Sequence, residues 1–95
     1  MRLKKRNEDL IASQILNICR NGAGKTRILY QANLNSSKVN HYLDNMKKNG
    51  FIAEVVLGSR IQYKTTQKGA ELMMRIDRLQ SEMDELHAHL FEVEL

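Results

Sequence analysis

A group of polar side chains between residues 36 and 41 combines hydroxyl, ammonium, amide and imidazole chemistry. Its members are Ser36, Ser37, Lys38, Asn40 and His41. An asparagine amide can pair with adenine, a lysine ammonium suits guanine, and serine or histidine can bond to bases or to phosphates. This combination is typical of a surface that contacts nucleic acid, if one element presents these side chains outward.

Four more basic residues flank this group in the sequence. Lys25 and Arg27 precede it and are placed to anchor phosphates from the start of a helix. Arg60 and Lys64 follow it. We expect Arg60 at the tip of a hairpin, within reach of a minor groove or a phosphate, and Lys64 on one face of the returning strand together with Gln62.

The charge of the chain is divided unevenly along its length. The net charge is +4, but residues 1–64 contain 12 basic and 4 acidic residues, whereas residues 65–95 contain 3 basic and 7 acidic ones. The basic part includes an N-terminal cluster that is either a flexible arm or the start of a helix: Arg2, Lys4, Lys5 and Arg6. A basic segment followed by an acidic one indicates that the first part binds a polyanion, most commonly nucleic acid.

The sequence does not indicate a nucleotide site, a metal site or a catalytic site. The segment GAGKT at 22–26 resembles the end of a nucleotide-binding P-loop, but that motif requires a glycine where Cys19 stands. His87 and His89 would point about 200° apart on a helix, so they cannot share a metal ion. No catalytic constellation or cofactor loop is apparent, and we therefore expect neither an enzyme nor a bound cofactor.

The single cysteine and the terminal residues bear on the compartment. Cys19 lies among apolar residues, which predicts a buried and unreactive thiol. No apolar run is long enough to span a membrane, and polar residues follow the basic N-terminus where a signal peptide would be apolar. We expect a cytoplasmic protein that is associated with the nucleoid and has no membrane partner.

Hydrophobic spacing predicts three helices in the first half of the chain. The first covers Asn7–Arg20 and ends in a glycine-containing turn. The second is short, is capped by Thr26 and ends at Gln31. The third turns apolar side chains inward, with Tyr42 partly buried, so that the polar group of residues 36–41 faces outward; its inward stripe is Val39, Leu43 and Met46. Its cap is one of three neighbours: Asn35, Ser36 or Ser37.

Two short runs rich in β-branched and aromatic residues follow, at 51–57 and 61–65. The link between them, Gly58-Ser59-Arg60, is typical of a hairpin. Thr66, or Thr65, then caps a long last helix. Helix, helix, turn, helix, hairpin and long helix is the order of a winged helix-turn-helix domain with a terminal extension. In a helix-turn-helix, the N-terminal part of the motif's second helix enters the major groove. That helix is the third of this chain, so the polar group of residues 36–41 would face the groove.

The last third of the chain carries an unbroken heptad of apolar residues. It comprises Leu72, Ile76, Leu79, Met83, Leu86, Leu90 and Val93. A stripe with this repeat predicts a coiled-coil helix that needs a partner, and a second copy of the chain is the expected one. The alternative is that the stripe packs on its own head, but a helix of about 39 Å outruns so small a head. We therefore divide the chain into a DNA-binding head, residues 1–65, and a dimerisation helix, residues 66–95.

The sequence also resembles a known family. The resemblance rests on KTRILYQANL at residues 25–34, NGFI at 49–52 and TQKGAEL at 66–72. These segments are similar to those of small archaeal winged-helix DNA-binding proteins, first described as chromatin proteins of Sulfolobales. The resemblance implies a homodimer joined by an antiparallel coiled coil, with one DNA-binding head at each end. In an antiparallel pair of these helices, we expect the stripes to match so that Leu72 meets the partner's Leu90, Ile76 the partner's Leu86 and Leu79 the partner's Met83.

These observations together predict a homodimer that binds double-stranded DNA through its helix-turn-helix and wing. The affinity would come largely from phosphate contacts and would fall steeply with salt. Our first interpretation is an architectural, chromatin-type protein. The alternative is a sequence-specific transcription regulator, and a further alternative is a protein–protein assembly module.

Overall fold

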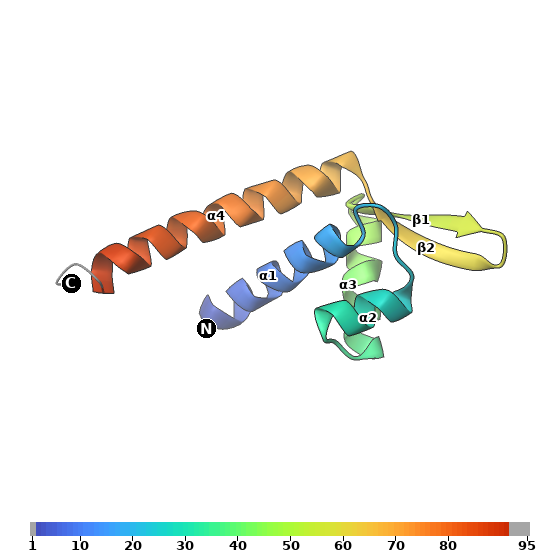
Figure 1. The fold of residues 1–95 in the computed structure, drawn as a ribbon, viewed down its shortest axis with the longest axis horizontal. Helices are drawn as coiled ribbons and strands as arrows, with labels where there is room; N and C mark the ends of the chain where they lie inside the picture. Colours follow the sequence, from blue (N-terminus) through green and yellow to red (C-terminus); the bar gives the residue numbers. More distant parts are fainter. Residues whose placement is uncertain (1, 92–95) are drawn as a thin grey trace.

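The computed structural model describes residues 2–91, with side chains from Glu8 onward. Its elements in chain order are α1 (Arg2–Ile18), α2 (Lys25–Ala32), α3 (Ser36–Lys48), β1 (Ile52–Leu57), β2 (Arg60–Thr65) and α4 (Gln67–Phe91). Figure 1 shows α1, α2, α3 and the hairpin gathered into a head, from which α4 extends. This order confirms the predicted winged helix-turn-helix head with a long C-terminal helix. Val93, the last residue of the predicted heptad stripe, lies outside the described residues.

The first helix is placed differently from the prediction. α1 begins at Arg2 rather than Asn7 and ends at Ile18 rather than Arg20. Arginine, leucine and lysine are good helix formers, so the basic run belongs to the helix and does not form a separate arm. The side chains of its basic cluster lie outside the described part of the structure: Arg2, Lys4, Lys5 and Arg6.

The helix-turn-helix begins with α2, and its start differs from the expected one. The backbone N–H of Ile28 donates a hydrogen bond of 3.1 Å to the carbonyl of Gly24, so Gly24 is the N-cap of the helix. Thr26 is therefore already inside the first turn, and the prediction that it caps α2 is wrong. At the other end, Asn33 adopts a left-handed conformation with φ of 56°, which asparagine tolerates and which ends the helix.

A side-chain cap then fixes the start of α3. The side-chain oxygen of Asn35 accepts a hydrogen bond from the backbone N–H of Lys38 at 2.8 Å. This bond satisfies one of the free N–H groups at the helix N-terminus. Of the three predicted caps, the structure selects Asn35.

β1 and β2 form the wing, an antiparallel hairpin in which Leu57 lies opposite Arg60. Gly58 and Ser59 alone make the turn, and Gly58 has φ of 63°. Two-residue hairpin turns favour this left-handed conformation because it matches the twist of the strands. Arg60 is thus the first residue of β2, not part of the link as predicted, and it still lies next to the tip.

Backbone and side-chain hydrogen bonds tie the wing to the rest of the head. Ala23, in the turn after α1, exchanges backbone hydrogen bonds of 3.0 and 2.8 Å with Tyr63 of β2. The hydroxyl of Thr65 donates to the carbonyl of Leu16 in α1 at 2.6 Å. These contacts place the start of α2 directly beside β2.

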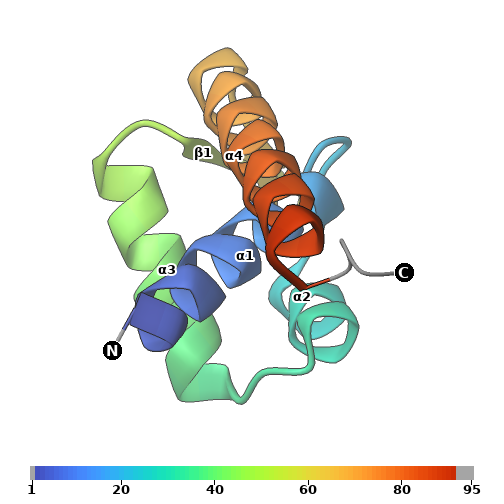
Figure 2. The same ribbon diagram turned by 90° about the vertical axis from the view of Figure 1, so that its left-hand side faces the viewer.

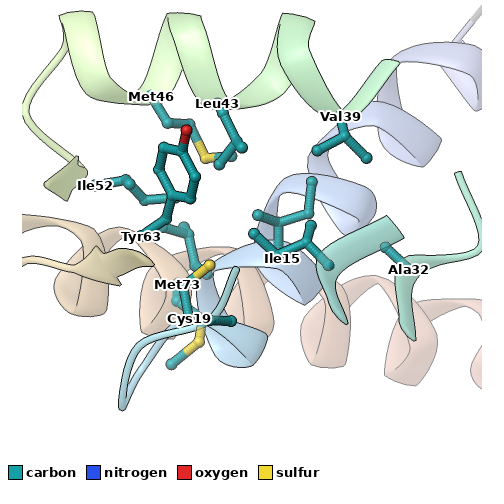
Figure 3. Packing of buried hydrophobic residues seen from close by; sticks show 12 residues of the cluster. Ile15, Cys19, Ala32, Val39, Leu43, Met46, Ile52, Tyr63 and Met73 are labelled. Carbon is teal, nitrogen blue, oxygen red and sulfur yellow. The ribbon is translucent and has the colours of Figure 1, made fainter. Parts of the chain in front are cut away.

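The core lies where the head elements meet the first turns of α4 (Figure 3). Its buried side chains are Ile15, Leu16, Cys19, Ala23, Ile28, Ala32, Val39, Leu43, Met46, Ile52, Tyr63 and Met73. The predicted inward stripe of α3 is confirmed, and Tyr42 is half-buried as expected. Fully burying one large aliphatic side chain contributes about 1.5–3 kcal/mol, so this cluster is the main source of stability for the head.

α4 starts in the core and then leaves the head. The Thr66 hydroxyl accepts a hydrogen bond from the backbone N–H of Gly69 at 3.0 Å, so Thr66 caps the helix as predicted. Gly69 and Met73 are buried, and Figure 2 shows α1 between α4 and the pair formed by α2 and α3. The 25 residues of α4 span about 37 Å, in a molecule of 58 × 26 × 21 Å. The far half of α4 therefore projects beyond the core.

Candidate nucleic-acid interface

The outer face of α3 presents polar side chains at its N-terminal end. Ser36, Ser37, Lys38 and His41 are exposed, as predicted. The helix period places Ser37 and His41 on the side opposite the buried Val39, and Lys38 about 100° around the helix from it. Free N–H groups and the helix dipole add positive potential at this end, which favours phosphate nearby.

Asn40 does not share this outer face. Its side chain is half-buried, and its Oδ1 is buried with no hydrogen-bond partner among the described residues. Asn40 follows Val39 directly and lies only about 60° around the helix from Leu43, at the edge of the inward stripe. The expectation that it faces outward is therefore wrong. The buried side of α3 extends beyond its apolar residues and includes part of Asn40.

Asn45 also lies on the outer face and was not among the predicted site residues. Its side-chain amide donates a hydrogen bond of 2.8 Å to the carbonyl of His41. The same nitrogen lies 3.4 Å from Nδ1 of the His41 ring. Asn45 therefore restricts the position of the imidazole. The signal in the sequence was the spacing of four residues, which brings two helical side chains together.

An open cleft of about 510 Å³ separates the start of α2 from the wing. Its lining consists of Gly22, Ala23, Gly24, Lys25, Thr26, Arg27, Arg60, Ile61 and Gln62. Cations from two distant parts of the sequence thus border one cleft, although nothing in the sequence indicated that they lie together. The P-loop-like segment forms one wall of this cleft.

The cations at the cleft carry charge that no neighbouring acid neutralises. Lys25, Arg27 and Arg60 are exposed, and none forms an ion pair with another described side chain. Lys47, by contrast, lies 3.6 Å from a carboxylate oxygen of Glu54. The cleft is therefore a place on the described surface of the head where an anion would meet several unpaired cations.

Lys64 lies on the wing at some distance from the cleft. It is exposed and pairs with Ala53 near the base of the hairpin. Gln62, which was expected on the same face, is half-buried and faces Gly22, where an added Cβ would meet its Oε1 at 2.8 Å. Lys64 is thus placed to act separately from the cations of the cleft.

Cys19 lies in the core behind this surface and has no exposed area, as predicted. Burial raises the pKa of its thiol to about 11, and the positive charge of Arg27 acts in the opposite direction. A thiol that stays protonated at neutral pH and has no contact with solvent is a poor nucleophile. The structure therefore gives Cys19 a packing role.

The tip of the wing carries an apolar surface that was not predicted from the sequence. Val56, Leu57 and Ile61 are 69%, 52% and 48% exposed. Successive side chains on a strand point to opposite faces, and only one face of the wing packs on the head. A run of consecutive apolar residues in a hairpin was therefore a signal that some of them remain in solvent.

The free half of α4 presents the predicted heptad stripe to solvent. Leu79, Met83, Leu86 and Leu90 are 61%, 45%, 58% and 75% exposed. Leu72 and Ile76, closer to the head, are half-buried. Leu72 packs against the core, but from Leu79 to Leu90 the stripe does not fold back on its own head, which was the alternative that the sequence left open.

None of the described helices is long and apolar enough to cross a membrane. Within the same part of the chain, no three His, Cys, Asp or Glu side chains are grouped to hold a metal ion. The surface around α3 and the wing combines hydrogen-bonding and cationic groups with the exposed aliphatic side chains of the wing tip.

Solved structures similar to this one include a DNA-binding protein. Sso10a-2, a DNA-binding protein from Sulfolobus solfataricus, has a TM-score of 0.80 and 28% sequence identity over 88% of both chains. This confirms the resemblance to small archaeal winged-helix proteins. No curated protein matches the chain.

Two bacterial transcription regulators share the fold at lower sequence identity. MepR from Staphylococcus aureus has a TM-score of 0.74 and 16% identity, over 93% of this chain and 74% of its own. PcaV from Streptomyces coelicolor has a TM-score of 0.73 and 14% identity, over 95% of this chain and 76% of its own. The wing, the helix-turn-helix and the long helix are thus arranged as in known winged-helix structures.

A family-level match covers most of the chain. The sequence profile of the winged helix-turn-helix family matches residues 5–84. This range includes the helix-turn-helix, the whole wing and more than half of α4. The chain therefore belongs to the winged helix-turn-helix family.

Proposed function

We propose that this protein is a homodimer that binds double-stranded DNA and acts as an architectural, nucleoid-associated protein. One observation carries the DNA binding: the unpaired cations Lys25, Arg27 and Arg60 border one cleft, in a head whose α3 exposes its polar N-terminal face. The description of Sso10a-2 as a DNA-binding protein supports the same partner.

In this proposal each exposed group has a distinct role. α3 enters the major groove, and Ser36, Ser37, Lys38 and His41 face the bases or the nearest phosphates. The cations of the cleft and Lys64 contact the phosphate backbone on either side. Asn40 is not included, because its side-chain oxygen points into the protein.

Phosphate contacts dominate the affinity in this arrangement. Each neutralised phosphate releases counterions, so the logarithm of the binding constant falls linearly with that of the salt concentration. Three or four contacts in each head, doubled in a dimer, give a slope of about −6. Such affinity depends little on sequence, which suits an architectural role.

The homodimer forms through α4 in this proposal. The exposed stripe residues of the far half of α4 pack against those of a second copy running in the opposite direction, with Leu79 meeting the partner's Met83 at the centre. Residues 1–65 serve as the DNA-binding head and residues 66–95 as the dimerisation helix. The two heads then lie far apart, so the dimer can bridge, bend or stiffen DNA without reading one compact palindrome.

The test is binding to a random-sequence duplex, followed by fluorescence anisotropy across a salt series. Submicromolar affinity near physiological salt with a steep slope supports the architectural protein. Binding weaker than about 10 μM, which is the usual non-specific background, favours a regulator that requires its own operator. The double variant Lys38→Glu, Arg60→Glu should lose binding; unchanged binding would favour a protein–protein assembly module.

One observation favours the regulator as the second candidate function. The side-chain amide of Asn45 donates a hydrogen bond to the backbone carbonyl of His41 and lies against its ring, which restricts the imidazole. A side chain fixed in this way on the outer face suits the recognition of particular bases. Selection of bound duplexes from a random pool separates the two functions. Enrichment of one short motif supports the regulator, whereas a pool that stays random supports the architectural protein.

A further inference from the structure

The tip of the wing combines exposed aliphatic side chains with positive charge. Val56 lies opposite Ile61, and Leu57 lies opposite Arg60, next to the turn. The three aliphatic side chains are about half exposed or more. Exposed apolar groups at a hairpin end promote aggregation unless a partner covers them, so this tip has the composition of a contact surface.

The location of the tip separates it from the stripe on α4. In Figure 1 the wing projects from the head at the end opposite the free end of α4. A second copy that packs along the free half of α4 would therefore leave the wing tips uncovered. The occupant of the tip is a different partner from the one proposed for α4.

The charge around the tip identifies the chemistry of that partner. Arg60 belongs to the tip, and Lys25 and Arg27 face it across the cleft. The one acidic residue of the hairpin, Glu54, lies away from the tip and pairs with Lys47. Aliphatic groups flanked by unpaired cations match a surface that is apolar in the middle and anionic at its edges. The minor groove of DNA has this character, with sugars and base edges between two rows of phosphates.

We propose that the wing tip is an apolar wedge that enters the minor groove and bends the duplex, which rests on the DNA binding proposed above. Leu57 and Arg60 share one face of the hairpin next to the turn, so Arg60 reaches a phosphate at the edge of the groove while Leu57 presses between adjacent base pairs. Val56 and Ile61 cover the sugars on the other face. Two strands are wider than the groove of about 6 Å, so the tip fits only where the groove opens. Insertion of an aliphatic side chain opens the groove and kinks the duplex.

The test measures the bend directly with the full chain. A duplex of roughly 30 base pairs carries a fluorescent donor and acceptor at its two ends, and energy transfer reports their distance at saturating protein. The wild-type protein should bend the duplex by about 20–90°, the range of known wedge proteins. The variant Val56→Thr, Leu57→Thr keeps residues that favour strands and should leave the duplex nearly straight.

Two further variants, Met74→Thr and Arg60→Gln, separate the effect of the wedge from that of the phosphate contacts. Met74→Thr, at a residue of α4 that is 59% exposed, should bend DNA like the wild type. The wing double variant should bind about tenfold more weakly, because it removes apolar burial, with an unchanged salt slope. Arg60→Gln should reduce the slope by about one unit per head.

Three results would overturn the wedge. One is a duplex that stays straight under saturating wild-type protein, and another is a bend that the wing double variant retains. The third is a wing variant that changes the mass of the free protein in light scattering but not the bend, which would make the tip a contact between copies. A wild-type protein that binds no duplex even at low salt would instead remove the proposed function itself.

Discussion

The hydroxyl of Ser13 in α1 donates a hydrogen bond of 2.7 Å to the Oδ1 carboxylate oxygen of Asp77 in α4. Ser13 is only 7% exposed, whereas Asp77 is exposed. Two residues further along α4, Leu79 is 61% exposed. The bond thus marks the level at which α4 changes from a helix of the core to a projecting helix.

Loss of this hydrogen bond should destabilise the docking of α4 on α1. We expect Ser13→Ala to lower the free energy of unfolding by about 1–2 kcal/mol, because a bond to a carboxylate is stronger than one between neutral groups. Urea denaturation followed by circular dichroism measures this. Asp77→Asn keeps an acceptor and should cost less. Equal stability of Ser13→Ala and the wild type would show that the bond makes no net contribution.

Gly69 should be intolerant of any side chain. A Cβ at this position would run into the carbonyl oxygen of Phe51 and lie 2.9 Å from a methyl group of Thr65. The backbone carbonyl cannot move without shifting β1, so Gly69→Ala should destabilise the protein by about 1–3 kcal/mol or more, despite the better helix propensity of alanine. Thermal denaturation gives the comparison.

An exposed residue in the same helix provides the control for Gly69. Glu71→Ala changes one side chain in the same region of α4 without a clash, and its melting temperature should stay close to that of the wild type. If Gly69→Ala were as stable as Glu71→Ala, α4 would have to lie farther from Phe51 than in this structure.

The sequence was sufficient for the elements that depend on local periodicity. The stripe of α3, the Thr66 cap and the hairpin all follow from short-range rules, and the structure confirms them. The boundaries of α1 and the start of α2 were missed. In both cases the deciding factor was the conformation of the residues around the helix end, where several neighbours have similar propensities.

The arrangement of the candidate site depended on tertiary contacts that no local rule contains. Lys25 and Arg60 border the same cleft because Ala23 bridges to Tyr63, and that bridge depends on how α1 ends. The orientation of Asn40 likewise depends on what packs beside α3. Residue types with suitable chemistry were visible in the sequence, but which of them face one another was not.

Asn40→Ala should keep or increase stability. The mutation removes a buried oxygen that has no partner among the described residues, and alanine is the better helix former by about 0.5–1 kcal/mol. The melting temperature should therefore rise or stay constant, and affinity for a random duplex should be unchanged. A large loss of affinity in a stable variant would show that Asn40 turns outward on DNA.

Alkaline pH should weaken the fold through Cys19. Its pKa is raised by burial from 9.0 to about 11, so the folded state holds the proton more tightly than the unfolded state. The resulting stability is complete below pH 9 and is lost as the pH rises through 11, with a total of roughly 1–3 kcal/mol. Urea denaturation at pH 7, 9 and 10.5 measures the decline.

Two observations isolate the contribution of the thiol. Cys19→Ala should be less stable at pH 7, because it leaves a small cavity, but should lose less stability between pH 9 and 10.5. Tyr63 contributes in the same direction, since burial and the charge of Glu54 raise its pKa. Rapid labelling of native Cys19 by a thiol reagent at pH 8 would contradict the burial.

The exposed stripe on α4 should control self-association. Leu79 and Met83 lie at the centre of the proposed dimer, and both are at least 45% exposed in the single chain. Met74 is 59% exposed but lies about 200° around the helix from Leu72. Leu79→Asp and Met83→Asp should therefore convert a dimer into a monomer in sedimentation velocity, whereas Met74→Asp should remain dimeric.

The same variants link the dimer to DNA binding. A monomer keeps one head, so the salt slope for a random duplex should fall to about half of the wild-type value, in proportion to the number of phosphates contacted. Met74→Asp should keep the full slope. Because each substitution is on an exposed position, the head should stay folded, which circular dichroism checks. If all three variants sedimented alike, the stripe of α4 would have a different partner from a second copy of this chain.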